Sequence, residues 1–218
     1  KLCLRGTTDY WVNALDGRPF FLVSCPVDPG LLEVLRTDIV PRLLTDAPGQ
    51  PTAAELAADP LRHRFTLVFD RAGYSPQFFA EQKAQRVAVL SYHKFPGDDW
   101  ATEEFTPHDL TLANGEKVTL ALAERGTCLS NGLWVRELRQ REETGHQVSL
   151  LSTDYRSELR TLAVRLFARW TQENFLKYMR EHYAIDRLVE HGTEPLPETT
   201  TVVNPARRQL ESQIRREQ

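Results

Sequence analysis

The pattern of apolar and polar positions predicts a β-hairpin followed by a helix at the start of the chain. Two segments rich in β-branched and aromatic residues, 7–15 and 19–25, flank an Asp-Gly pair. Gly17 in that pair supplies the positive φ that a tight turn between antiparallel strands requires. Apolar residues then recur at helical spacing over 31–44, and Pro41 should kink or restart this helix.

The middle of the chain has the pattern of a parallel strand–helix–strand unit. A nearly continuous apolar run at 65–69 ends in Asp70, and such a run is typical of a strand buried on both faces. A helix that begins near Ser75-Pro76 and a second buried strand at 86–92 follow. Because this connection is compact, the two strands should be parallel. A short helix is also predicted over 53–58, within a loop-like stretch.

Short alternating segments from Phe95 to Leu151, separated by Asn-Gly and Thr-Gly pairs, predict an all-β meander. A long helix follows over 156–189, then a Pro- and Thr-rich linker and the start of a charged helix. The fold class predicted is therefore α/β, a mixed sheet with flanking helices that is interrupted by a β-rich insertion. The predicted divisions are a first core part, the insertion, a core helix and a C-terminal linker with helix, at 1–94, 95–151, 152–192 and 193–218.

Composition narrows the class of protein only slightly. The 218 residues are 41% hydrophobic and 26% charged, within the range of soluble globular proteins, and no apolar run reaches the length of a membrane span. The three cysteines are far apart, which suits neither a disulfide framework nor a zinc site. A net charge of −3 argues against nonspecific coating of nucleic acid, although it leaves room for one basic groove.

Asp70 is the first candidate for chemistry. It follows a buried strand and precedes a turn, so it should lie at the carboxyl edge of the parallel strands, where open α/β sheets bind their ligands. The alternative is structural, because an aspartate in this position also caps turns.

Glu173 is the second candidate. It falls on the helix face whose other members are apolar, namely Leu159, Leu162, Leu166 and Trp170. A carboxylate on such a face is costly unless it is paired or binds a cation. The structural alternative is a salt bridge, since Arg169 and Lys177 lie four residues before and after it. Carboxylates that converge from separate elements are what two-metal phosphodiester chemistry requires.

Three segments, LCLRGTTDYWVNALDGRPFF, TLVFDRAGYS and FARWTQENFLKYMREHYAIDRLV, resemble the insertion-sequence DDE transposases, which have a β-rich insertion in a ribonuclease H-like core. The resemblance matches Asp70 to the second catalytic aspartate. It matches Arg169 and Glu173 to the Arg-x-x-x-Glu context of the catalytic glutamate. The tyrosine and lysine of the related Tyr-x-x-Arg-x-x-x-Glu pattern are here Leu166 and Arg180, so the charge is kept and the hydroxyl is lost.

The resemblance also implies that the first catalytic aspartate lies upstream of this sequence. The chain is then expected to be a fragment that is inactive alone. Asp9 is the acidic residue on a nearby strand, but it matches the second strand of the family and not the first.

What the resemblance implies for function is metal-dependent cleavage and strand transfer of transposon ends. Asp70 and Glu173 would hold two Mg²⁺ or Mn²⁺ ions, while Arg169, Lys177 and Arg180 would bind DNA phosphates. The implied partners are double-stranded transposon-end and target DNA and a second copy of the chain, in a bacterial cytoplasm at the nucleoid. Two alternatives remain: a catalytically inactive remnant that at most binds DNA, and a nuclease of the same fold that does not join strands.

Overall fold

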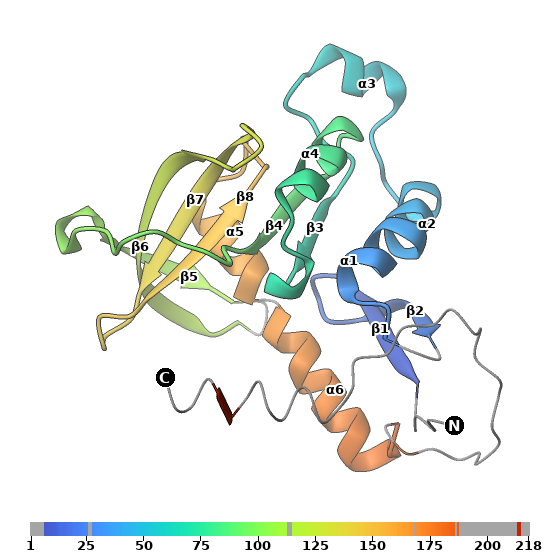
Figure 1. The fold of residues 1–218 in the computed structure, drawn as a ribbon. Helices are drawn as coiled ribbons and strands as arrows, with labels where there is room; N and C mark the ends of the chain where they lie inside the picture. The colour runs from blue at the N-terminus through green and yellow to red at the C-terminus, as the bar shows by residue number, and fades with distance from the viewer. Residues whose placement is uncertain are drawn as a thin grey trace.

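The computed structural model describes residues 7–25, 28–112, 115–167, 169–185, 187 and 213–214. Strands form a two-stranded sheet of order β1-β2 and a six-stranded sheet of order β3-β4-β8-β7-β6-β5 (Figure 1). Among the strand pairs of these described residues, β3 and β4 are parallel and the others are antiparallel. The strands are β1 (Thr8–Asn13), β2 (Pro19–Cys25), β3 (Thr66–Phe69), β4 (Ala88–Tyr92), β5 (Thr106–Thr111), β6 (Lys117–Cys128), β7 (Trp134–Arg141) and β8 (Gln147–Ser152).

Helical segments precede, connect and follow these strands. The α-helices are α1 (Leu31–Val34), α2 (Val40–Asp46), α3 (Ala53–Ala58), α4 (Pro76–Ala84), α5 (Leu159–Phe167) and α6 (Arg169–Tyr183). The other helical turns are the π-helical η1 (Leu35–Ile39) and the 3₁₀ turns η2 (Arg71–Gly73) and η3 (Thr102–Glu104). A mixed α/β architecture is thereby confirmed.

The predicted N-terminal hairpin is present as β1 and β2. Gly17 turns the chain with a φ of 83°, and the pairing shifts register between Val12 and Asn13. The predicted kink in the helix that follows takes the form of the π-helical turn η1, which lies directly before Pro41 in α2. Because proline has no N–H to donate, a widened turn lets the helix continue past it.

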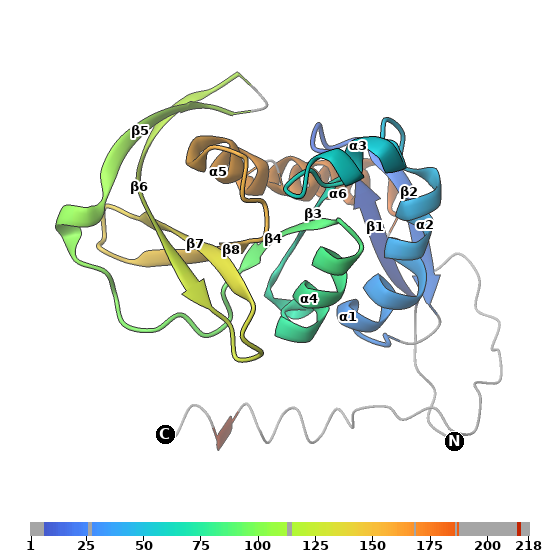
Figure 2. The same ribbon diagram turned by 90° about the horizontal axis from the view of Figure 1, so that it is seen from above.

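The two faces of the six-stranded sheet are covered by different helices (Figures 1 and 2). On one face α1, η1 and α4 form a core with the hairpin, in which Val34, Phe78 and Leu151 are fully or almost fully buried. On the other face Leu162 and Leu166 of α5 pack against Leu90, Leu138 and Leu150. The unit β3-α4-β4 is therefore the parallel strand–helix–strand that the sequence predicts.

The predicted β-meander forms β5 to β8, and its last strand pairs with β4. Tyr92 lies opposite Leu150, so the meander and the parallel strands make one continuous sheet. This sheet curls until β5 and β6 arch over α5 (Figure 2), where Ala163 packs against Leu110 and Leu122. The division into a core and a separate insertion stays a prediction.

The long helix predicted over 156–189 is shorter in the structure. It begins at Leu159 as α5, and the helical segment α6 ends at Tyr183, because Ala184 adopts a left-handed φ of 51°. The predicted linker at 193–201, and the predicted helix beyond it except for 213–214, lie outside the described residues.

Leu162 should be the strongest single link between α5 and the sheet, because it is fully buried. We expect Leu162→Ala to lower the free energy of unfolding by about 2–5 kcal/mol, from lost burial and the cavity left behind. Urea denaturation measures this change. Leu61→Ala is the matched control, since Leu61 is 50% exposed and should change stability by less than about 0.5 kcal/mol. Equal losses in the two variants would contradict this packing.

Candidate functional site

Asp70 lies at the carboxyl end of β3, as the sequence predicts. Its carboxylate Oδ1 accepts a hydrogen bond of 2.9 Å from the backbone N–H of Ala72, so it caps the turn η2. The hydroxyl of Ser91, in β4, donates to the Asp70 backbone carbonyl over 3.2 Å. Gly73 allows the turn to pack against Phe69, because a Cβ there would lie 2.6 Å from the phenylalanine ring. Asp70 thus caps the turn, as the structural alternative predicts, and these hydrogen bonds fix the residue in place.

The backbone directs the Asp70 side chain toward the face that α5 covers. Val68 packs on the α5 side of the sheet and Phe69 on the α4 side. Asp70 continues in an extended conformation, with φ −82° and ψ 179°. Since side chains alternate along extended backbone, Asp70 shares the side of Val68. It is half-buried there.

Glu173 lies in α6, which continues the chain from α5. Arg169, Glu173, Lys177 and Arg180 all fall within this helix, at spacings of four, four and three residues. Such spacings place side chains on one helix face. The side chains of Lys177 and Arg180 are exposed, whereas those of Arg169 and Glu173 lie outside the described residues.

Leu166, at the position of the family's tyrosine, has a packing role. It is 2% exposed and belongs to the core cluster between α5 and the sheet. An apolar side chain suits this position because a tyrosine hydroxyl buried there would need a partner.

The described part of the chain does not by itself assemble a metal centre. It contains no group of three or more histidine, cysteine, aspartate or glutamate side chains placed to hold a metal ion. Asp9, the other acidic candidate, is exposed on the hairpin and accepts a hydrogen bond from the hydroxyl of Ser24.

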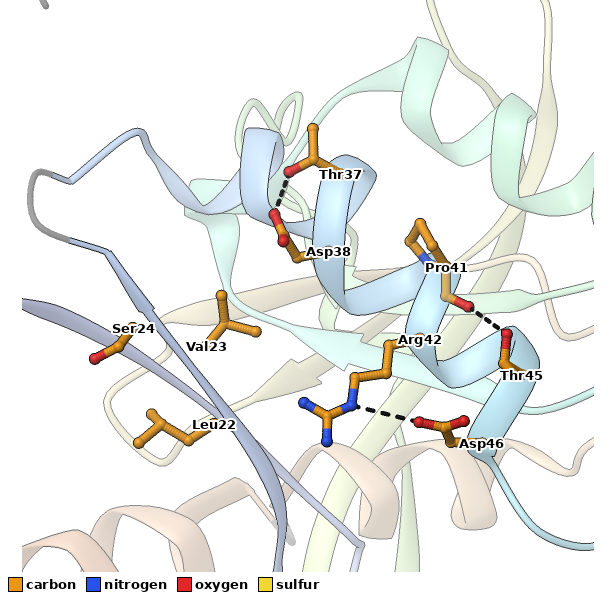
Figure 3. A pocket seen from close by; sticks show the side chains of 9 residues that line it. All are labelled: Leu22, Val23, Ser24, Thr37, Asp38, Pro41, Arg42, Thr45 and Asp46. Carbon is orange, nitrogen blue, oxygen red and sulfur yellow. Dashed lines mark hydrogen bonds and ion pairs between the residues drawn. The ribbon is translucent and has the colours of Figure 1, made fainter. Parts of the chain in front are cut away.

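An open hollow of about 750 Å³ lies between β2 and the helices η1 and α2 (Figure 3). Arg42 and Asp46, two of the exposed charged residues that line it, form an ion pair in which the Arg42 guanidinium lies 3.4 Å from the Asp46 carboxylate. The Arg42 guanidinium also lies 4.1 Å from the centre of the Phe21 ring. None of the predicted site residues lines this hollow.

Asp154 is a fully buried carboxylate that the sequence analysis does not identify. It follows β8 and accepts hydrogen bonds from the backbone N–H groups of Arg156 and Ser157, at 3.0 and 2.9 Å, and from the Arg165 guanidinium of α5 at 2.8 Å. Burial alone would raise the pKa of Asp154, but the hydrogen bonds outweigh it and lower the pKa to about 2. Asp154 thus anchors the start of α5 to the sheet.

Glu137 and Arg139 form a second buried charged network, on the α4 face of β7. The Glu137 Oε1 accepts hydrogen bonds of 2.8 Å from the Arg139 guanidinium and from the Ser149 hydroxyl, and lies 3.6 Å from His93 Nδ1. Burial would raise the pKa of Glu137, but His93, Ser149 and Arg139 hold it at about 2. A glutamate and an arginine that are two residues apart share one face of a strand. This spacing is the sequence signal that could have identified the network.

The described residues thus form a mixed α/β protein with a carboxylate at the edge of its parallel strands. Residues 1–218 match a family model described as "Transposase protein". The chain therefore belongs to this transposase family, which supports a role in transposition. No curated protein matches the chain. Among the described residues, none of the helices has the length and apolar character needed to cross a bilayer.

Glu137 should make stability depend on pH. Its pKa of about 2 in the folded protein lies below its ordinary value of 4.5. The carboxylate therefore contributes stability, on the order of 3 kcal/mol, that is present above pH 4.5 and is lost as the pH falls towards 2. We expect Glu137→Gln to unfold at lower urea concentration at neutral pH, because Arg139 stays buried without a carboxylate to balance its charge. This deficit should shrink below pH 4.5.

Glu142→Gln is the control for this series, since Glu142 is exposed on the turn after β7. It should follow the wild-type protein at every pH. A deficit for Glu137→Gln that stays constant from neutral pH down to pH 3 would contradict the role assigned to this carboxylate.

Proposed function

We propose that this transposase uses a DDE-type site, in which Asp70 and Glu173 are two of the metal-binding carboxylates. The observation that carries the proposal is positional. Asp70 projects from the carboxyl edge of β3 toward the α5 face, and α6, which continues from α5, carries Glu173 among three basic residues on one helix face. Carboxylates from a strand end and from a helix on the same side of a sheet can converge on one site.

We further propose a ribonuclease H-like core. Support comes from the antiparallel hairpin β1–β2, which shares a hydrophobic core with the parallel pair β3–β4. Helices on both faces of the sheet also fit this arrangement. In the family that the chain resembles, the first catalytic aspartate lies on a strand before the hairpin. That aspartate, and not Asp9, would complete the set of metal-binding carboxylates, since Asp9 is hydrogen-bonded to Ser24.

The donor set fits magnesium or manganese, because both ions prefer carboxylate oxygens. When bound, two such ions supply stabilisation of the attacking and leaving oxygens during in-line displacement at phosphorus. Asp70 and Glu173 would hold them. Arg169, Lys177 and Arg180 would bind the phosphates of the DNA and keep the strand in line with the carboxylates.

The partners proposed are double-stranded DNA, at transposon ends and at the target, and a second copy of the chain. The site of action would be the bacterial cytoplasm, at the nucleoid. A remnant that binds DNA without catalysis is the second candidate. It is favoured by the turn-capping hydrogen bond of Asp70, which gives this carboxylate a structural role that needs no metal.

Removal of either carboxylate should abolish transposition with little loss of stability. We expect Asp70→Asn and Glu173→Gln, each in the complete transposase reading frame, to reduce magnesium-dependent excision of the transposon from a donor plasmid by at least about a hundredfold. The measurement is excised product, alongside a thermal unfolding curve for each variant.

Asp46→Asn and Glu33→Gln are matched controls, because both residues are exposed on α1 and α2. They should excise at the wild-type rate. Undiminished excision by Asp70→Asn or Glu173→Gln would refute the site. A wild-type protein that binds DNA and never excises would support the remnant.

The exposed basic residues of α6 should contribute to DNA affinity through phosphate contacts. We expect Lys177→Gln and Arg180→Gln each to weaken binding to any duplex, and to lower the slope of log Kd against log salt by about 1. Fluorescence anisotropy over a salt series measures this slope. Lys117→Gln, at the exposed start of β6, is the control. Slopes unchanged in both α6 variants would show that this helix face does not contact DNA.

A further inference from the structure

An exposed aromatic side chain lies just beyond the carboxyl end of β4, the strand that neighbours β3. Phe95 is 68% exposed. The pairing of Phe69 with Ser91 places Asp70 level with Tyr92, and Phe95 follows three residues later. The residues next to this edge include Tyr74, Tyr92, His93, Lys94 and Phe95, which we call the edge cluster.

Tyr74 connects the edge cluster to Asp70. It directly follows the turn η2 that Asp70 caps. Its ring stacks on His93, with centroids 6.0 Å apart and an interplanar angle of 29°, and it meets Phe95 edge-on at 5.9 Å. It also packs edge-on against Phe79 of the core at 5.9 Å. Phe95 is therefore supported on one side by a ring that the core holds.

His93 in turn fixes the cluster to the meander. Its backbone N–H donates a hydrogen bond of 2.9 Å to the Ser149 carbonyl, and its Nδ1 lies 3.6 Å from the buried Glu137 carboxylate. Two neighbouring strands thus hold the platform on which Tyr74 and Phe95 rest. A preorganised platform loses little conformational entropy when it binds a ligand.

Positive charge accompanies these rings. The Lys94 ammonium lies 5.5 Å from the centre of the Phe95 ring, and the Arg71 guanidinium lies 6.0 Å from that of Tyr92. Lys94 and Arg71 are both exposed. Aromatic faces stack on unpaired bases, and adjacent cations bind the phosphates of the same strand. A base inside an intact duplex offers no free face to such a ring.

From this arrangement we propose that Phe95 stacks on an unpaired base of a DNA strand, while Lys94 binds that strand's phosphate. The ligand is single-stranded DNA at the end of a duplex. The inference goes beyond the proposed function, because the edge cluster is supported from the α4 side of the sheet, whereas Asp70 projects toward the α5 side. In this proposal, the residues at this edge of the sheet bind a DNA strand without a metal ion.

The experiment compares two labelled probes in EDTA: a duplex with a short single-stranded tail and the same duplex with blunt ends. The complete protein is titrated into each, and anisotropy is recorded. We expect Phe95→Ala to weaken binding to the tailed probe about tenfold, the typical loss of one stacked base, and to leave the blunt probe unchanged. Phe20→Ala is the matched control, because Phe20 is 43% exposed on the hairpin.

A second measurement locates the contact in the unaltered protein. Iodouracil placed in the tail forms a photo-cross-link with an aromatic ring that stacks on it, and mass spectrometry should identify the peptide with Phe95. Lys94→Gln should weaken binding to the tailed probe more than to the blunt probe, and should lower the salt slope for the tailed probe by about 1. Lys83→Gln is its control: Lys83 lies 5.0 Å from the ring of Tyr155, at the opposite edge of the sheet.

The inference would be overturned if Phe95→Ala left the affinity for the tailed probe unchanged, or if it weakened binding to both probes equally. A cross-link confined to other peptides would also overturn it. These results are separable from a failure of the proposed function. Both probes are titrated in EDTA, where metal-dependent excision cannot occur, whereas loss of excision in Asp70→Asn tests the carboxylates alone.

Discussion

The pairing of β4 with its two neighbours organises the rest of the structure. On one side β4 is parallel to β3, and on the other it is antiparallel to β8, so it joins the parallel unit to the meander. Val89, Leu90 and Ser91 are fully buried within it. Ser91 holds the backbone of Asp70, while Leu90 packs against α5. The strand-end carboxylate and the helix that leads to Glu173 are therefore both positioned from this one strand.

Local patterns were sufficient to predict most elements of the fold. The Asp-Gly turn of the hairpin, the parallel β3-α4-β4 unit and the four strands of the meander depend on residues close in sequence, and each is present. The partner of β4 could not be predicted in this way. Both β4 and β8 are short, largely buried strands, and such strands do not encode which neighbour they pair with. Nor does the pattern show that a π-helical turn precedes Pro41.

The candidate site was predictable to a similar extent. The position of Asp70 follows from strand length and a turn, and the shared face of α6 follows from helical spacing. The buried carboxylates Asp154 and Glu137 were missed, because charged residues are usually exposed. Partners from distant segments, such as Arg165 and His93, stabilise these carboxylates in the protein interior. These partners meet the carboxylates only in the folded chain. In turn, the Asp154 network holds α5, and the Glu137 network holds His93 at the carboxyl end of β4.

The central claim, that Asp70 and Glu173 belong to one metal site, can be tested most directly by iron-mediated backbone cleavage of the complete transposase. Fe²⁺ that replaces Mg²⁺ reduces added hydrogen peroxide to hydroxide and a hydroxyl radical, ascorbate returns the resulting Fe³⁺ to Fe²⁺, and the radicals cut the chain next to the metal ligands. The account predicts cuts beside both Asp70 and Glu173, suppressed by excess Mg²⁺ and lost together in Asp70→Asn. Cuts beside one residue alone, or cuts that survive Asp70→Asn, would contradict it.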